Sequence, residues 1–261
     1  MKKTNFERLE DLIKSKLVEV SSSFNNDLKL GDYVFYTIED DALDLNFEEK
    51  SVCFVVKNKS NLKITSKNKE GKIIFVLLDS LNVVFELNGI FELNVVALSN
   101  ASFNSFVDLT KLDLKLQTFS KPKVELSVNM ALISRGFVKV DPLIFVNDNS
   151  KTYLNLMAVN LSNFSSQGKA FVNSKDVDVA MNLRCLNLGD EVELTPILEV
   201  NDNEVKASHS ALIYGFDEDA LFYFMAKGLS REDAELLFVR EQLGKYLKEK
   251  FFDSIIEKVE L

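Results

Sequence analysis

The chain contains one histidine, His209, and two cysteines, Cys53 and Cys185, in 261 residues. Imidazole and thiolate groups bind transition metals readily, so these residues are the first candidates for metal or redox chemistry. The two cysteines are far apart and form no CxxC pair, which excludes a disulfide framework and a zinc site built from cysteines. Any metal site must therefore draw ligands from elsewhere.

His209 lies in the segment 205–211, which reads VKASHSA and alternates in side-chain type, with small residues on both sides of the histidine. The alternation indicates an extended strand with the imidazole on one face. Ser208 and Ser210 are small and would let another surface approach closely. A lone histidine is more often a hydrogen-bonded structural residue than a ligand, so the pattern permits a ligand role without demonstrating one.

Three carboxylates offer a competing chemistry. Asp176, Asp178 and Asp190 could act as the paired acids of a solenoid that cleaves polysaccharides, although exposed acidic residues at strand edges are far more common. No GxxxxGK[ST], GxGxxG, HExxH or GxSxG motif is present, and one histidine cannot serve both a catalytic triad and a metal cage. We predict that the chain is not an enzyme, with a solenoid hydrolase as a minor alternative.

The overall composition limits the classes of partner that the chain can bind. Forty acidic residues against 31 basic ones give a formal net charge of −9, and no basic stripe is interleaved with aromatic residues, which argues against nucleic acid. The longest apolar run, 73–78, is too short to span a bilayer, and the first residues lack a signal-peptide core. A cytoplasmic location without membrane contact is expected.

The elements that must position these residues change character along the chain. Apolar residues at helical spacing predict a short helix over 6–20. Short segments rich in Val, Ile, Leu and Phe then predict strands. They are 33–37, 51–56, 72–78, 82–87, 91–97, 111–119, 123–130, 137–140, 153–160, 169–172, 177–183, 191–194 and 197–200. No long helix interrupts them, which excludes a doubly wound sheet and leaves a sandwich, a barrel or a solenoid of stacked strands.

Helical spacing returns after residue 217. Asp217 is placed to cap a helix over 218–227, Gly228 would end it, and Ser230 would begin a second helix that runs towards the end of the chain. The apolar run 222–225 is hard to bury on one helix face. By default the hairpin's apolar residues would pack on the β body as core, and contact of an exposed part with a partner protein is the second interpretation.

The residues from 196 to 234 carry a family resemblance. They read Pro196-x-Leu198-Glu199, then EVKASHSA over 204–211, then Asp217-Glu218-x-x-Leu221-Phe222-Tyr223, then KGLS over 227–230 and Glu232-Asp233-Ala234. This run resembles the C-terminal signature of the SufB/SufD family, the core subunits of the SUF iron–sulfur cluster assembly complex. That signature reads P-x-L-E-I, V-K-C-S-H-G-A and D-E-x-x-L-F-Y-L-x-S-R-G-L-x-E-x-x-A. The chain looks closest to a shortened SufD.

The resemblance implies a mostly β fold. It would be a right-handed parallel β-helix core with a short N-terminal helix and a C-terminal helical domain. The corresponding division is 1–30 for the N-terminal segment, 31–214 for the β-helix and 215–261 for the helical domain.

The resemblance also implies two partners: a SufC-type ABC ATPase, and a second SufB/SufD-type subunit in a homodimer or heterodimer. The ATPase contact would fall on residues of the hairpin: Asp217, Glu218, Leu221, Phe222, Tyr223, Gly228, Leu229, Ser230, Asp233 and Ala234. The chain would then be a non-catalytic subunit that couples ATPase motion to cluster assembly. A metal-independent β-solenoid binding module remains the alternative.

Within the subunit interface, His209 matches the SufD histidine where a transient iron–sulfur cluster is thought to form. The family's cysteine position is Ala207 here, the positions flanking the histidine are Ser208 and Ser210, and a SufB-type interface cysteine falls at Val200. The chain could therefore offer one imidazole and bind no cluster tightly by itself, with sulfur ligands coming from a partner. Cys185 is a further, weakly supported candidate for sulfur handling.

Overall fold

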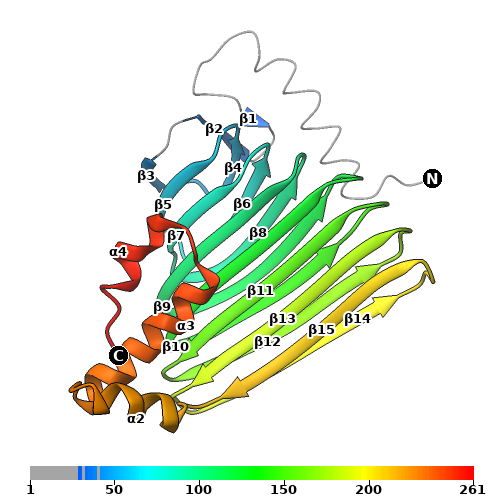
Figure 1. Cartoon of the computed structure of the whole chain (residues 1–261). Coiled ribbons are helices and arrows are strands. Elements are labelled where there is room, and N and C mark those ends of the chain that lie inside the picture. Colours follow the sequence, from blue (N-terminus) through cyan, green and yellow to red (C-terminus); the bar gives the residue numbers. More distant parts are fainter. Residues whose placement is uncertain (1–28, 31–32, 40–41) are drawn as a thin grey trace.

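The structure is a computed structural model that describes residues 29–30, 33–39 and 42–261. The helix predicted over 6–20 lies outside the described residues. Within them, the chain forms a parallel β-solenoid followed by short helices at the C-terminus (Figure 1). The predicted β-helix with a C-terminal helical part is thereby confirmed.

The strands follow one another along almost the whole described chain. They are β1 (Lys29–Leu30), β2 (Tyr33–Ile38), β3 (Ala42–Phe47), β4 (Ser51–Val56), β5 (Ser60–Ser66), β6 (Glu70–Leu77), β7 (Leu81–Glu86), β8 (Gly89–Ala97), β9 (Ala101–Ser120), β10 (Glu125–Phe145), β11 (Lys151–Asn160), β12 (Asn163–Val172), β13 (Val177–Asn187), β14 (Val192–Val200) and β15 (Val205–Tyr214).

Successive strands alternate between two parallel rows. The first row is β2-β4-β6-β8, the C-terminal halves of β9 and β10, then β12 and β14. The second row is β3-β5-β7, the N-terminal halves of β9 and β10, then β11, β13 and β15. Each strand inside a row therefore pairs with strands one coil earlier and one coil later, and among the described strands only β1 pairs antiparallel, with β2.

The long strands β9 and β10 bend from one row into the other. The ladder between them is irregular between Ser134 and Phe137. At this corner a Cβ on Gly136 would lie 2.1 Å from the carbonyl oxygen of Thr110. No larger residue fits without moving the backbone, so the glycine allows two coils to turn the corner in close contact.

The main hydrophobic core fills the space between the two rows. Alternate residues of each strand point into it, as the period of two requires. In β13, for example, Val179, Met181 and Leu183 are buried in this core, while the residues between them are only partly buried. The core extends from Ile38 and Phe47 in the first coils to β13.

Coil length increases along the chain. Asn82 bonds to Asn61, 21 residues earlier, whereas Ser210 bonds to Asn182, 28 residues earlier. A repeat that lengthens in this way has no fixed period in the sequence. The sequence alone could therefore not separate a solenoid from a sandwich by periodicity.

An unbroken column of side-chain amides crosses the second row. Each Asn side-chain nitrogen donates to the amide oxygen of the preceding coil, at 2.8–3.0 Å, and Ser210 Oγ donates to the last of these oxygens at 2.7 Å. The column consists of Asn61, Asn82, Asn104, Asn129, Asn155, Asn182 and Ser210. Such ladders hold the register of stacked strands.

The C-terminal helices pack on the outer face of the second row. They are α2 (Glu218–Ala226), α3 (Arg231–Tyr246), the 3-10 turn η1 (Lys250–Phe252) and α4 (Asp253–Ile256). A second hydrophobic cluster joins Phe106, Ile133 and Met157 of the strands to helix residues such as Val239 and Phe252. The predicted second helix is thus interrupted after Tyr246. No helix among the described residues is long and apolar enough to cross a membrane.

Candidate functional site

The solenoid ends in two strands that each lack a partner on one side. Among the described strands, β14 pairs only with β12, and β15 pairs only with β13. We call this surface the open end. Strand edges carry unpaired backbone donors and acceptors, and a solenoid end without a polar cap also exposes the apolar layer meant for the next coil.

His209 faces into the open end. Its Cα pairs in register with that of Met181, which is fully buried in the core, so the imidazole lies on the inward side of β15. Unlike Met181, His209 is exposed, because no later coil covers it among the described residues. On the same side of β15, Ala207 is partly buried against the core and Ile213 is 47% exposed.

The other predicted interface residues divide between two faces. Val200, 41% exposed, ends β14 and pairs in register with buried Val172, so it belongs to the inward layer. Ser208 and Ser210 point outward from β15 and are exposed. Ser210 ends the amide column, a structural role that its sequence context did not indicate.

Cys185 lies in the coil beneath the open end, in register with Ile213, and is fully buried. Burial raises the pKa of its thiol to about 12, with an opposing hydrogen bond to the backbone of Asn160. Cys53 is also buried, and its pKa is likewise raised to about 12. Thiols with such pKa values are poor nucleophiles at neutral pH.

Three capping residues define helix ends in the α2–α3 hairpin. The Asp217 side chain accepts hydrogen bonds from the backbone N–H groups of Asp219 and Ala220, at 3.1 and 3.2 Å. Ser230 Oγ accepts from the backbone N–H of Asp233 at 3.1 Å. Gly228, with φ of 99°, takes the left-handed conformation that ends α2. All three capping predictions hold.

An ion-pair network ties the two helices together. Arg231 Nη2 contacts Glu218 Oε1 at 3.0 Å, and Arg231 Nε contacts Glu235 Oε1 at 2.7 Å. These contacts connect α2 with α3, and the hairpin joins β15 through Gly215, whose surroundings are open.

The hairpin exposes a group of apolar side chains that we call the hairpin patch. Phe222 is 73% and Tyr223 is 59% exposed, whereas Leu221 and Ala234 are fully buried. The patch consists of Phe222, Tyr223, Met225, Leu229 and Leu237. The sequence signature assigned Leu221 and Ala234 to partner contact, but both are buried in the cluster with the solenoid. It did not assign Leu237, whose exposed position on α3 only the packing reveals.

The acidic alternative receives little geometric support. Asp178 accepts a hydrogen bond from the Tyr153 hydroxyl at 3.1 Å, and Asp176 adopts a φ of 53° at a turn. The described residues contain no group of three or more His, Cys, Asp or Glu side chains that could hold a metal ion.

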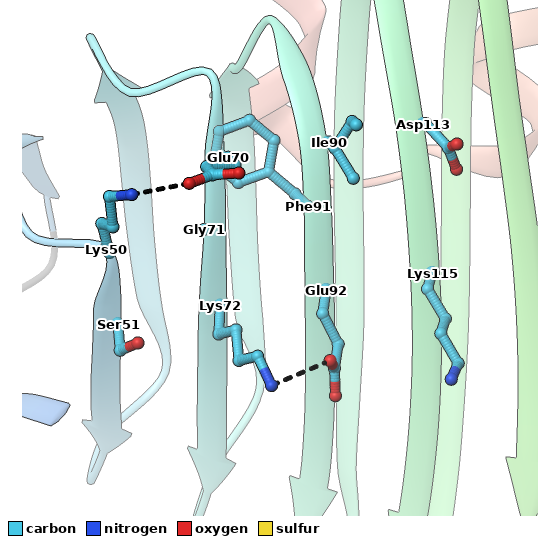
Figure 2. Close-up of a pocket in the computed structure, with 10 residues that line it drawn as sticks. All are labelled: Lys50, Ser51, Glu70, Gly71, Lys72, Ile90, Phe91, Glu92, Asp113 and Lys115. Atoms are coloured by element: carbon cyan, nitrogen blue, oxygen red, sulfur yellow. Dashed lines mark hydrogen bonds and ion pairs between the residues drawn. The ribbon is translucent and has the colours of Figure 1, made fainter. Parts of the chain in front are cut away.

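A groove over the early coils is no better candidate for chemistry. Figure 2 shows two ion pairs along it, Lys50 with Glu70 at 2.6 Å and Lys72 with Glu92 at 3.4 Å, and the two remaining charges that line it, Asp113 and Lys115, are opposite in sign. The Ser51 hydroxyl is the one potential nucleophile among the side chains that line it, and the basic and acidic side chains are equal in number.

Comparison with known proteins points to the open end and the hairpin together. Residues 159–242 match the family model described as SUF system FeS cluster assembly, SufBD core domain. The match begins in the last residues of β11 and ends within α3, so it contains β12 to β15 and the hairpin. Over these residues, the resemblance to the SufB/SufD family that the sequence signature indicated is confirmed.

Two curated relatives agree with this result. An iron-sulfur cluster assembly SufBD family protein of Methanocaldococcus jannaschii is 24% identical over 139 residues, which are 51% of this chain and 44% of the relative. Protein ABCI7, chloroplastic, of Arabidopsis thaliana is 38% identical over 60 residues, which are 23% of this chain and 12% of that protein. The chain thus spans less than half the length of either relative.

Proposed function

We propose that this chain is a non-catalytic subunit of an iron–sulfur cluster assembly machinery. It binds a SufC-type ABC ATPase through the hairpin patch and a second SufB/SufD-type subunit through the open end. The match of residues 159–242 to the SufBD core domain and the printed name of the Methanocaldococcus relative support the general role. The two surfaces support the division of that role between two partners.

The hairpin patch is the observation that carries the ATPase contact. Phe222 and Tyr223 are exposed on a capped helix, α2, which an ion pair connects to α3. Large aromatic side chains dominate the binding energy of protein interfaces, and their exposure costs the free subunit hydrophobic stabilisation. A partner that covers them recovers this free energy.

The open end supports the second contact. Its inward layer includes apolar residues that no described strand covers, among them Val200 and Ile213. A second subunit that stacks on this end would bury the apolar layer and pair the free edges of β14 and β15.

In this proposal the iron–sulfur cluster is cargo that the assembled complex builds and passes on. This chain contributes one imidazole, His209, at the open end, and its thiols are buried. A neutral imidazole binds iron, but iron–sulfur clusters are held mainly by thiolates, so the sister subunit must supply the sulfur ligands.

Co-purification with the SufC-type ATPase tests the proposal. The chain is co-expressed with the ATPase, and the complex is captured through a tag on the ATPase. Phe222→Asp should reduce the affinity at least about 30-fold, because a charge replaces a central aromatic anchor worth about 2 kcal/mol or more.

The matched control is Phe137→Asp. Phe137 is 60% exposed, but it lies on β10 of the solenoid and not on the hairpin. The control should bind the ATPase as the wild type does. Equal binding by both variants would show that the hairpin patch is not the ATPase contact.

A further inference from the structure

The methionines of the described residues differ sharply in their exposure to solvent. Met130, Met157 and Met181 are at most 1% exposed, whereas Met225 is 40% exposed. Met225 lies in the last turn of α2 and belongs to the hairpin patch. Of these four thioethers, it is therefore the one that a dissolved reagent can reach without unfolding the chain.

The packing of the other three methionines explains their protection. A Cβ on Gly168 would lie 2.6 Å from the Met181 sulfur, so that sulfur fills the space over the glycine. The Tyr214 hydroxyl donates a hydrogen bond to the Met157 sulfur at 3.6 Å, and Met130 lies in the main core. Oxidation of a thioether adds an oxygen atom to sulfur, and a close-packed core has no room for it.

The two cysteines offer little competition for an oxidant. Peroxides attack the thiolate form of cysteine. Cys53 and Cys185 are buried, and burial raises the pKa of each thiol to about 12, so both are protonated at neutral pH. Among the described cysteines and methionines, Met225 is thus the sulfur most open to peroxide.

Met225 occupies a central place in the hairpin patch. Phe222 precedes it by three residues, so the two side chains share a face of α2. The Met225 carbonyl oxygen accepts a hydrogen bond from the Gly228 N–H at 2.9 Å, and exposed Leu229 follows directly. A change at the Met225 sulfur therefore lies beside the aromatic residue that we expect to anchor the partner.

Oxidation would change the character of this surface. A sulfoxide replaces the apolar thioether by a strongly polar group that accepts hydrogen bonds from water. A partner that covers the patch has to remove this water, which costs free energy unless a donor takes its place. Lys227, the cation nearest in sequence, already lies over the Tyr223 ring at 5.5 Å.

We propose that Met225 is a reversible oxidation site and that its sulfoxide weakens binding of the ATPase to the hairpin patch. The inference rests on the proposed function of that patch. It adds a means of regulation, because peroxide would reduce the contact between the chain and its ATPase.

The oxidant is hydrogen peroxide, and the reaction balances. The Met225 sulfur attacks one peroxide oxygen, the O–O bond breaks, and this oxygen stays on sulfur as the sulfoxide. The other oxygen leaves as water with both protons, so sulfur loses two electrons and the peroxide gains them. Methionine sulfoxide reductases return the thioether, which makes the modification reversible.

The first experiment measures selectivity. The free chain is treated with hydrogen peroxide at neutral pH, the reaction is stopped with catalase, and peptide mass analysis follows each methionine. Met225 should be oxidised at least about tenfold faster than Met130, Met157 and Met181. Similar rates at all four positions would overturn the assignment of Met225 as the oxidation site.

The second experiment measures affinity for untreated SufC-type ATPase. Oxidation of the wild-type chain should lower the affinity at least about fivefold, and treatment with the reductase should restore it. Met225→Leu has no sulfur at this position, so its affinity should be the same before and after peroxide. Met225→Gln places a polar group there and should weaken binding without peroxide.

Two results would refute the effect on binding. One is unchanged affinity once Met225 is fully oxidised, and the other is an equal peroxide-induced loss in Met225→Leu. Phe222→Asp separates this inference from the proposed function. If Phe222→Asp lowers the affinity and the sulfoxide does not, the ATPase contact stands and the regulation is wrong. If neither has an effect, the hairpin patch is not the contact and both proposals fail.

Discussion

Among the inward-facing side chains of β14 and β15, His209 is the one that can donate an electron pair to a metal. It is exposed on the inward side of β15, next to small residues that leave room for a facing surface. Its neighbours in register are apolar, so it has no described carboxylate to hold it in one tautomer. A metal ligand from a partner would have to complete the site.

Replacement of His209 by alanine should leave the fold and ATPase binding unchanged and lower anaerobic cluster yield on the complex about tenfold or more. The loss follows because a methyl group cannot coordinate iron. Cluster yield is read from the visible absorption of the purified complex. Ser208→Ala, on the outward side of the same strand, is the control. Equal yields from both variants would favour a metal-independent binding module.

The raised pKa of Cys185 predicts how the stability of the fold depends on pH. Its pKa is about 12 in the folded chain, against a reference value of 9.0, because burial disfavours the thiolate. The folded state thus holds the proton more tightly than the unfolded state. The stabilisation is complete below pH 9 and is lost as the pH rises towards the folded pKa.

Between about pH 8 and pH 10, the free energy of unfolding should fall about 1 kcal/mol further in wild type than in Cys185→Ala. Denaturant titrations at the two pH values measure the difference. A parallel fall in both proteins would mean that the thiol is not protected in the folded state.

At the scale of elements, the C-terminal tail ties the helices to the solenoid. Arg135, at the corner of β10, forms a bidentate ion pair with Asp108 at 2.7 and 3.1 Å and donates to the carbonyl oxygen of Glu260 at 2.6 Å. Arg240 of α3 donates to the carbonyl oxygen of Val259 at 2.8 Å. The tail thus bridges α3 and the strands.

Arg135→Ala should release the tail and increase amide hydrogen exchange over 250–261, while the core strands keep their protection. Loss of a partly buried charged pair should cost about 1–3 kcal/mol. Arg231→Ala, which removes an exposed ion pair of the hairpin, should leave exchange in the tail unchanged. Unchanged exchange in both variants would show that apolar contacts alone hold the tail.

Some elements were predictable from sequence and others were not. The caps at Asp217 and Ser230 were predictable, because capping depends on a few local residues. Strands β3 and β5 were not predicted, since their outward positions hold residues such as Asp44 and Lys63 that weaken the apolar signal. The burial of Leu221 and Ala234 was also missed, because it depends on packing against distant strands.

At the scale of the whole molecule, the open end should control assembly. Ile213→Asp places a charge in the exposed inward layer of the open end. Because binding of a sister subunit would have to desolvate this charge, the substitution should weaken pairing about 100-fold or more. Sedimentation velocity of the chain alone and with the sister subunit measures the effect. Ile90→Asp, at a 62% exposed position on β8, should pair normally.

If Ile213→Asp and Ile90→Asp pair equally well, the subunits do not meet at the open end.

The architecture itself could be assigned from sequence only through the family signature. Because the coils lengthen along the chain, the sequence has no fixed repeat period. The local strand pattern is common to sandwiches and solenoids.

The amide column gives the open end an electrical polarity. Every Asn after Asn61 donates to the preceding coil and directs its carbonyl oxygen to the next, so the side-chain dipoles add along the solenoid axis. The negative end of the column lies at the last coil. There the Ser210 hydroxyl donates its hydrogen bond to Asn182 Oδ1, and its oxygen lone pairs can accept a hydrogen bond from another group. A subunit that stacks there is best matched if it places a hydrogen-bond donor opposite Ser210, so the column also selects the polarity of its partner.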